Sequence, residues 1–466
     1  MTTMCRSQVC NPTMWPSGST EGVSPAVVEG GKELVLSDQQ LAKYMELFEE
    51  NINRGLGKET NPTAIVKCFP TYVQHLPDGT EKGKYLALDL GGSNIRVLLV
   101  ELGTAMNINS KVFTIPLSIM QGQGTLLFDF IADCLIGFVK SNNVEEELPL
   151  GFTFSFPLVQ KGLKIGILER WTKDFSCPGV IGNDVVTMLQ DALERRGHKK
   201  ICIAAVLNDT TGTLMAAAFK HPRARIGLIV GTGTNGCYWE SQQKAELFDE
   251  PDSGSGKVII NLEWGAFGDD GALDFIRRSY DEDVDLHSVN PGKQKHEKMI
   301  SGMYMGELVR LMAEKFTKAG LMFEGRGSVS LFTRGALESS AVSDIERERY
   351  GEFTNVKRVC DSLGLTHATR EDYCNMRYLC SLISRRAAQM VAAGLSVLMR
   401  RVGHKKVAVG IDGTVYKFHP HFHNLMMEKI KDITGDEFDY SLFLVEDGSG
   451  IGAALLAAVL ARTQQL

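Results

Sequence analysis

The sequence of 466 residues carries a net charge of −6, and 44% of its residues are hydrophobic. This length suits two or three domains with sizeable cores, and the acidic balance argues against a protein that binds nucleic acid. No stretch approaches the ~20 apolar residues of a membrane span, so we expect no integral membrane segment. The ten cysteines show neither a C-x-x-C pair nor zinc-ligand spacing, which indicates reduced thiols in a cytosolic protein.

The N-terminal region is rich in Ser, Thr, Gly and Pro and lacks an apolar core. This composition excludes a secretory signal, and we predict a flexible tail over residues 1–33. Beyond the tail, apolar residues at helical spacing predict an amphipathic helix from Leu34 to Arg54, with Ser37 in its cap.

Four glycine turns follow apolar runs that are typical of β-strands. The first lies at Gly91, with Asp89 just before it, and the others lie at residues 231–236, at Gly413 and at residues 448–452. Glycine lets the backbone bend tightly and lets a phosphate approach its N–H groups, and a helix N-terminus attracts an anion. Because the first two turns share a strand–turn–strand plan, we predict two lobes that each begin with a phosphate-binding hairpin.

Residues 231–236 also fit the G-x-G-x-x-G dinucleotide fingerprint, but that motif must open a helix. The following Cys237-Tyr238-Trp239 favours a strand instead. The sequence also lacks the G-x-x-x-x-G-K-[ST] of P-loop proteins and the H-R-D and D-F-G of protein kinases. We therefore expect the glycine turns to bind a nucleoside triphosphate in a cleft between the two lobes.

Asp209 stands where a predicted strand gives way to a predicted helix. The apolar run Ile201 to Leu207 predicts the strand, and Leu214 to Phe219 predicts the helix. An aspartate at such a position is most simply an N-cap. However, ligands of open α/β sheets collect at strand ends, and glycine turns flank Asp209 in the sequence. Asp209 is therefore a candidate to take the proton of a hydroxyl that attacks the γ-phosphate.

Other amides and carboxylates of the expected cleft could hydrogen-bond several hydroxyls of a polyol. Among them, Glu263 has apolar neighbours, which indicate partial burial and hence the need for a polar partner. The whole set is Asn208, Asp209, Asn235, Glu263 and Glu297. From the residues alone, the predicted reaction is phosphoryl transfer from a nucleotide to a small hydroxylated molecule.

The remaining pattern predicts further elements and three side-chain clusters. The acidic run 281–285 is expected to face solvent, and Glu307 and Arg310 are expected to pair on a helix surface. The histidines within 419–423 could bind a metal, but we favour a loop that opens the next helix. A strand is predicted over residues 150–156, and helices over residues 126–140, 183–196, 303–319, 339–359 and 378–401.

The chain from about Leu34 to Leu456 closely resembles hexokinases of the actin-like ATPase superfold. The resemblance rests on the motifs at residues 88–96, 150–157, 171–173, 208–210, 231–235, 263–268, 297–298 and 410–416. It implies an α/β fold of two lobes, each a mixed sheet flanked by helices, with the active site in the cleft between them. The small lobe would comprise residues 83–206 and 450–466, and the large lobe residues 34–75 and 210–446.

The resemblance also implies an activity, which is the ATP-dependent phosphorylation of the 6-hydroxyl of glucose, mannose or fructose, the first step of glycolysis. Asp209 would be the general base, and Lys173 would aid binding and stabilise charge. The sugar-binding residues would be Ser155, Thr172, Lys173, Asn208, Asp209, Asn235, Glu263 and Glu297. The nucleotide site would be lined by Asp89, Gly91, Gly92, Ser93, Asn94, Arg96, Thr232, Gly233, Thr333, Gly413, Thr414 and Ser449. ATP would carry Mg²⁺, with Asp89 holding a metal-bound water.

One set of motifs in this length resembles a single-unit hexokinase of glucokinase-like size, and we expect a monomer. The apolar N-terminal segment that docks some hexokinases to mitochondria is not seen, so we expect a cytosolic protein. The chain departs from the family pattern at Ser93 (usually Thr), Asp174 (Gly), Ile181 (an acid), His296 (an aromatic) and Ile451 (a basic residue).

Two other functions remain open at this stage. A catalytically weak sensor of the same fold would bind glucose, close and signal through a partner, and Asp174 and Ile451 keep this alternative in play. An actin-like filament ATPase would share the glycine turns, but it would have no use for Asn235, Glu263 and Glu297.

Overall fold

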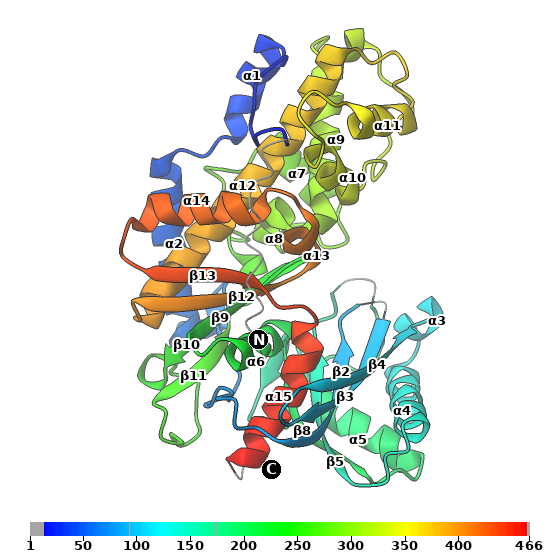
Figure 1. Cartoon of the computed structure of the whole chain (residues 1–466), viewed down its shortest axis with the longest axis vertical. Coiled ribbons are helices and arrows are strands. Elements are labelled where there is room, and N and C mark those ends of the chain that lie inside the picture. The colour runs from blue at the N-terminus through cyan, green and yellow to red at the C-terminus, as the bar shows by residue number, and fades with distance from the viewer. Residues whose placement is uncertain (1–13, 93, 173–174, 464–466) are drawn as a thin grey trace.

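The computed structural model describes residues 14–92, 94–172 and 175–463, and it contains two large sheets joined by helices (Figure 1). The five-stranded sheet has the order β4-β3-β2-β5-β8. The six-stranded sheet has the order β1-β11-β10-β9-β12-β13. We call them the small and the large sheet. A short pair, β6 (Leu158–Gln160) and β7 (Gly166–Leu168), lies outside both.

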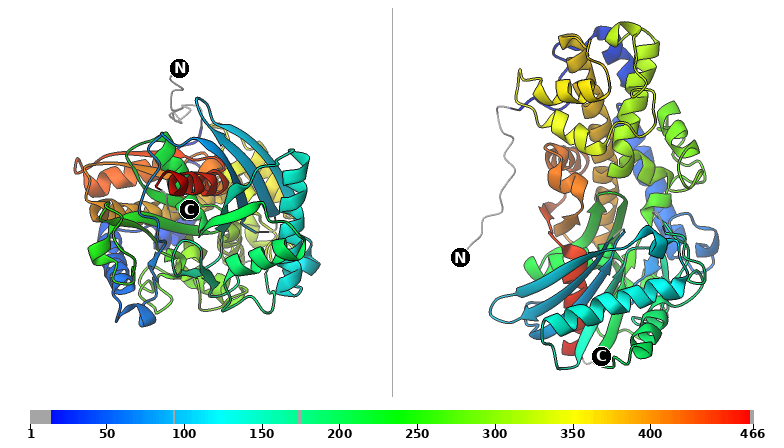
Figure 2. Two further views of the ribbon diagram at one scale, coloured as in Figure 1. Left: turned by 90° about the horizontal axis from the view of Figure 1, so that it is seen from below. Right: turned by 90° about the vertical axis from the view of Figure 1, so that its right-hand side faces the viewer.

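The small sheet buries both of its faces. On β2, Leu86, Leu88 and Leu90 pack with one helical layer, whereas Tyr85 and Ala87 pack with another, because successive side chains of a strand point to opposite faces. Helices α4 and α5 cover the first face and α15 the second, and Figure 2 shows α4 and α15 on opposite sides of the strands. The strands are β2 (Gly83–Leu90), β3 (Asn94–Leu102), β4 (Asn107–Thr114), β5 (Leu148–Phe154) and β8 (Ile201–Leu207). The helices are α3 (Leu117–Met120), α4 (Gly124–Ser141), α5 (Val185–Arg195) and α15 (Gly448–Arg462).

The large sheet lies between α6 and a thick helical layer built around α12. The 33 residues of α12 give a length of about 50 Å. Local chemistry sets both of its ends, because Thr369 and Asp372 form a capping box and Gly403 closes the helix with a φ of 74°. The strands are β1 (Phe69–Pro70), β9 (Ala224–Val230), β10 (Thr234–Ser241), β11 (Lys257–Asn261), β12 (Lys406–Asp412) and β13 (Asp439–Leu444).

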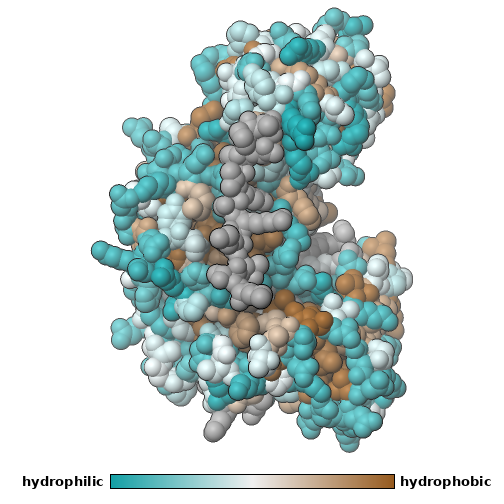
Figure 3. All heavy atoms as spheres, viewed as in Figure 1, coloured by the Kyte–Doolittle hydropathy of each residue, from teal (hydrophilic) through white to brown (hydrophobic). Residues whose placement is uncertain are grey.

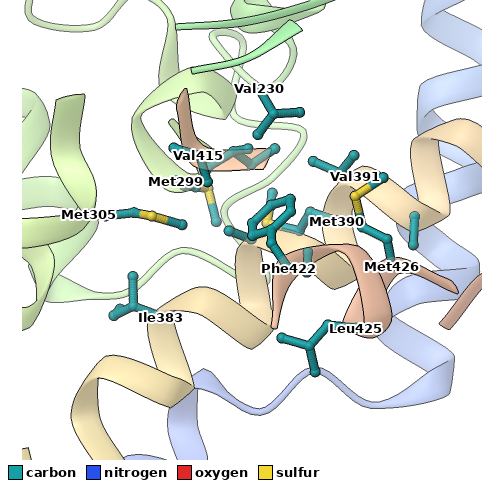
Figure 4. Packing of buried hydrophobic residues seen from close by; sticks show 14 of the residues in the cluster. Val230, Met299, Met305, Ile383, Met390, Val391, Val415, Phe422, Leu425 and Met426 are labelled. Atoms are coloured by element: carbon teal, nitrogen blue, oxygen red, sulfur yellow. The ribbon is translucent and has the colours of Figure 1, made fainter. Parts of the chain in front are cut away.

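The helices of this half of the molecule bring a large apolar core against β9. Phe422, Leu425 and Met426 of α14 meet Met390 and Val391 of α12 close to the end of β9 (Figure 4). The helices are α2 (Asp38–Leu56), α6 (Asp209–Lys220), α7 (Ser279–Leu286), α8 (Lys295–Ile300), α9 (Gly302–Lys318), α10 (Ser339–Glu346), α11 (Thr354–Ser362), α12 (Arg370–Val402), α13 (Thr414–Phe418) and α14 (Phe422–Thr434). Short 3-10 turns lie at Lys32–Leu34, Asn61–Thr63, Gln242–Lys244, Trp264–Ala266 and Phe323–Gly325.

Helices α6 and α15 cross at two glycines. A Cβ on Gly452 would lie 1.8 Å from the carbonyl oxygen of Gly212, so the two backbones are in direct contact. The small sheet is equally close to α15, because a Cβ on Gly151 would lie 2.0 Å from the Ala453 carbonyl oxygen. Helix α6, which begins at Asp209, is thereby fixed against α15, and α15 against the small sheet.

The prediction of a flexible tail over residues 1–33 is wrong for residues 14–33, and residues 1–13 lie outside the described residues. Helix α1 (Pro25–Gly31) packs against the helical layer. Trp15 is 4% exposed, with the Arg377 guanidinium 3.8 Å from its ring centroid and the Tyr350 ring 4.4 Å away. The Ser- and Gly-rich composition conceals these few apolar anchors.

Two other predictions of exposure are wrong in part. Within the run 281–285, Glu282 is exposed, but Asp281 is buried, and its charge is compensated by the Arg386 guanidinium of α12, which donates to both carboxylate oxygens at 2.6 and 2.8 Å. The predicted pair of Glu307 and Arg310 is present at 2.7 Å, but Arg310 is 2% exposed. In addition, the helix predicted over 339–359 is two helices, α10 and α11.

The assignment of residues to a small and a large lobe stays a prediction. The space-filling view shows an indented outline on one side, between the helical upper part and the part that holds the small sheet (Figure 3). Within the described ranges, every helix is too short or too polar to cross a membrane.

Candidate active site

The carboxyl ends of three parallel strands lie at one edge of the small sheet. Strand β5 runs parallel to β2 and to β8, so the residues that follow these strands share that edge. They include Gly91 after β2, Ser155 after β5 and Asp209 after β8. Asp209 therefore lies at a strand end, as predicted, and it is also the first residue of α6.

The large sheet places its own glycine turns in the same way, because β9, β12 and β13 are parallel. Gly231 follows β9 and Gly413 follows β12. Gly413 has a φ of 115°, and a Cβ there would lie 2.4 Å from the Val230 carbonyl oxygen, so no other residue fits. The two turns touch each other, since a Cβ on Gly231 would lie 3.1 Å from the Gly413 Cα.

The N-terminus of α15 connects the two sheets through two carboxylates. The Gly448 N–H donates to Asp412 of the large sheet at 3.0 Å, and the Ser449 hydroxyl donates to Asp89 of the small sheet at 2.7 Å. Beside them, Arg96 of β3 pairs with Asp447. The first and fourth predicted glycine turns are therefore in contact, although they are far apart in the sequence.

Asp412 belongs to this site, although we did not select it from the sequence. Burial raises its pKa, which the N–H groups of Gly413 and Gly448 oppose. The signal was present, since Asp412 ends a predicted strand directly before a glycine turn, much as Asp89 lies two residues before Gly91.

Four polar side chains form one hydrogen-bonded group near Asp209, which we call the amide–carboxylate group. The Asn235 amide donates to Glu263 Oε1 at 3.2 Å and to Asn261 Oδ1 at 2.8 Å. The Asn261 amide donates to the same Glu263 oxygen at 2.9 Å, and Asn208 lies 3.5 Å from the Asn235 amide. Asn261 was not among the predicted site residues, although it lies two positions before Glu263.

Glu297 joins this region from α8. The Thr234 N–H donates to Glu297 Oε2 at 3.0 Å, one residue before Asn235. A Cβ on Gly233 would lie 2.5 Å from the same oxygen, which explains the glycine at this point of the turn. Glu297 thus lies directly beside the β9–β10 turn.

Asp209 acts electrostatically on both halves of the site. Burial raises the pKa of Glu263, and the Asp209 carboxylate adds to that rise, while the Asn261 amide opposes it. The same Asp209 carboxylate adds to the rise in the pKa of Asp412, which burial dominates. The charge of Asp209 therefore acts on the amide–carboxylate group and on the strand end that carries Asp412.

Several predicted residues are less closely tied to these groups. Thr333 lies in an exposed loop before α10, where its hydroxyl donates to the Val329 carbonyl at 2.8 Å. Thr172 is half-buried beside Trp171, whose ring stacks on Phe175 at 5.3 Å. Gly92, Asn94, Thr232 and Thr414 lie in or beside the turns. Ser93, Lys173 and Asp174 lie outside the described residues.

The departures at Ile181 and Ile451 fall in different surroundings. Ile451 is buried among the apolar residues of α15, and Ile181 is exposed. Isoleucine carries no charge, so neither position supplies the charged group that the family pattern has there.

His296, the residue before Glu297, is fully buried and neutral. Its Nδ1 lies 3.0 Å from the Trp264 carbonyl oxygen, and its Nε2 lies 2.7 Å from the Tyr44 hydroxyl. Aromatic rings of Tyr44, Trp264 and Phe267 surround it. Burial lowers the pKa of His296 from 6.5 to about 3, so the native protein keeps the imidazole uncharged across the physiological range.

This low pKa predicts a loss of stability in acid. Because the unfolded chain binds a proton near pH 6.5 and the native chain does not, stability falls as the pH drops below 6.5. Between pH 7.5 and 5 this single group should cost about 2 kcal/mol. We expect the free energy of unfolding of His296→Phe to fall less than that of the wild type over this range. Urea titrations at the two pH values would measure the difference, and equal acid losses would contradict it.

The fold and the site together define an α/β protein of the actin-like ATPase class, with two sheets whose strand ends carry phosphate-type glycine turns. Family models described as Hexokinase match residues 26–219 and 225–459. The chain belongs to the hexokinase family, as the motifs predicted.

Individual relatives agree with this assignment. Human Hexokinase-2 is 44% identical over 445 residues, which are 93% of this chain and 48% of that protein. Mouse Hexokinase HKDC1 is 45% identical over 438 residues, which are 92% of this chain and 47% of that protein. The chain thus spans about half the length of the curated relatives it matches. The structure of a hexokinase from Schistosoma mansoni complexed with glucose matches with a TM-score of 0.87 and 41% identity, covering 95% of this chain and 100% of that one.

Proposed function

We propose that this chain transfers the γ-phosphoryl group of ATP to the 6-hydroxyl of a hexose, with glucose, mannose and fructose as substrates. The observation that carries the proposal is the position of Asp209, which follows Asn208 of the amide–carboxylate group at the end of β8 and begins α6, the helix that contacts the N-terminus of α15 at Gly212. A base between a hydroxyl-binding group and a phosphate-binding group is what phosphoryl transfer to an alcohol needs. The relatives named hexokinases and the glucose complex from Schistosoma mansoni support this choice.

The amide–carboxylate group would bind the sugar. Both amides that meet Glu263 use its Oε1, so among the described residues Oε2 is left to accept from a sugar hydroxyl. Asn208, Asn235 and Glu297 would hold further hydroxyls, together with Ser155, Thr172 and Lys173. Several directed hydrogen bonds of this kind would fix the 6-hydroxyl beside Asp209.

The glycine turns would hold the nucleotide. The Cβ that Gly91 lacks would lie 3.8 Å from Asp89 and 4.0 Å from Ser155, so its absence leaves room for a phosphate at the edge of the small sheet. The N-terminus of α15 adds the positive end of a helix dipole close by. The carboxylates of Asp89 and Asp412 suit Mg²⁺, directly or through water, and the ion supplies charge neutralisation to the phosphates.

In the proposed reaction, Asp209 takes the proton of the 6-hydroxyl while that oxygen attacks the γ-phosphorus. The new O–P bond forms as the bond between the γ-phosphorus and the β–γ bridging oxygen breaks, and ADP leaves. Lys173 would stabilise the charge on the transferred group. Closure of the lobes over the sugar would exclude water and so prevent simple hydrolysis of ATP.

The test is a coupled assay for glucose 6-phosphate with purified protein, ATP, Mg²⁺ and glucose. We expect turnover with glucose, and none with 6-deoxyglucose, which lacks the accepting hydroxyl. Calorimetry would be run in parallel to measure glucose binding. Tight glucose binding without product would replace the kinase proposal with the sugar sensor, and ATP-dependent sedimentation without a sugar effect would indicate a filament ATPase.

A further inference from the structure

A buried chain of polar contacts runs behind the amide–carboxylate group. The Tyr44 hydroxyl lies 2.7 Å from His296 Nε2, and His296 Nδ1 lies 3.0 Å from the Trp264 carbonyl oxygen. A carbonyl can only accept, so Nδ1 carries the hydrogen and Nε2 accepts from Tyr44. Tyr44, His296 and Trp264 are all buried, so each of these bonds forms away from water.

The chain continues from Trp264 to the β9–β10 turn. The Trp264 indole N–H donates to the Thr234 hydroxyl at 3.2 Å, and that hydroxyl donates to the Ile229 carbonyl at 2.9 Å. The Thr234 N–H in turn donates to Glu297. One connected network therefore runs from α2 through α8 to the end of β9.

Three residues of the network, His296, Trp264 and Thr234, are each next in sequence to a predicted sugar ligand. His296 precedes Glu297, Trp264 follows Glu263, and Thr234 precedes Asn235. The side chains of the network point into the core, and the neighbouring residues reach the site. A shift of any one contact would therefore move a sugar-binding group.

The Glu263 backbone lies in an unfavourable conformation. Its φ of 56° and ψ of 45° lie in the left-handed region. This conformation costs free energy for any residue with a Cβ, and glycine alone adopts it easily. The hydrogen bond from His296 Nδ1 to the Trp264 carbonyl holds Trp264, the residue that follows Glu263, in place. Glycine would relieve this strain, but it would also remove the carboxylate that the proposed site needs.

We propose that Tyr44 and His296 are positioning residues, which set the sugar affinity by fixing the backbone at Glu263 and Glu297. This inference rests on the proposed function, since it concerns the sugar ligands of that site. Neither residue would touch the substrate. Their removal should therefore weaken sugar binding more than it slows the chemical step.

The test compares Tyr44→Phe, His296→Phe and the double variant. Tyr44→Phe leaves His296 Nε2 without its partner, and His296→Phe leaves both the Tyr44 hydroxyl and the Trp264 carbonyl without theirs. The resulting shift should raise KM for glucose about tenfold in each single variant. The value of kcat should change less than threefold. The double variant still lacks the donor to the Trp264 carbonyl, and Tyr44 acts only through His296, so its KM should stay within about twofold of that of His296→Phe alone.

Tyr238→Phe is the matched control. Tyr238 is also a fully buried tyrosine, and its hydroxyl donates to Glu240 at 2.7 Å in a separate cluster with Arg401. This variant should lower Tm and leave KM unchanged. If Tyr44 had a purely structural role, Tyr44→Phe would likewise lower Tm and leave KM unchanged.

The outcomes separate this inference from the proposed function. If the wild type makes no glucose 6-phosphate, the kinase proposal fails, and calorimetric Kd values for glucose replace KM in the same comparison. The positioning role is overturned if Tyr44→Phe shifts KM or Kd less than twofold, if the shift of the double variant is the product of the two single shifts, or if the wild type does not bind glucose.

Discussion

Replacing Asp209 by asparagine is expected to lower the turnover of glucose by about 10²- to 10⁴-fold, which is the usual contribution of a general base. The amide has almost the same shape as the carboxylate and can still accept from the Thr210 N–H, which now lies 2.9 Å from Asp209 Oδ1. The fold should therefore survive, while the group that takes the proton is lost. Coupled kinetics give kcat, and calorimetry should show that glucose still binds.

Asp184→Asn provides the control for this substitution. Asp184 also lies at the start of a helix. It is the N-cap of α5, where it accepts from the N–H groups of Val186 and Thr187. Because Asn and Asp cap helices equally well, the control should keep wild-type kcat. An Asp209→Asn protein that retained more than a tenth of the wild-type turnover would remove Asp209 from the role of base.

The second large effect concerns stability and the crossing of α6 and α15. We expect Gly452→Ala to lower the free energy of unfolding by about 3 kcal/mol, the upper end of the cost of overpacking a core. The added Cβ would lie 1.8 Å from the Gly212 carbonyl oxygen and 2.3 Å from its carbonyl carbon. Both atoms belong to the backbone, so no side chain can rotate away and the helices must separate.

Gly137→Ala is the matched control, because it makes the same change within another helix. Gly137 lies on the exposed side of α4, and no atom lies within 4 Å of the Cβ it would gain. Alanine should there raise stability by about 0.5–1 kcal/mol, since glycine weakens a helix interior. Urea unfolding would measure both variants, and a Gly452→Ala protein as stable as Gly137→Ala would refute the tight crossing.

Local chemistry made much of this fold predictable from the sequence. The strand predicted over Ile201–Leu207 has those bounds in the structure, and the helix predicted over 126–140 is α4. Residues 231–236 lead into a strand, as the β-prone Cys237-Tyr238-Trp239 indicated. Apolar periodicity and turn residues carry this information because both depend on near neighbours in the chain.

The features that the sequence left unpredicted depend on distant partners. Asp281 reads as exposed within an acidic run, and only the fold brings Arg386 of α12 to it. Trp15 reads as part of a polar tail until Arg377 and Tyr350 close around it. In the candidate site, the pairing of β11 with β10 brings Asn261 beside the Asn235 amide, and this pairing cannot be inferred from near neighbours in the chain.

The place of α15 in the sequence has a consequence for the order in which this protein can fold during synthesis. The five strands of the small sheet lie between residues 83 and 207, but the helix that covers their second face begins at Gly448. A nascent chain therefore exposes an apolar sheet face to solvent or to chaperones while about half of the sequence is still being translated. Asp89 and Asp412 also lack their donors from Ser449 and Gly448 during that time. The proposed nucleotide site cannot be completed before α15 leaves the ribosome, so under that proposal early fragments should be unable to bind ATP in the native manner.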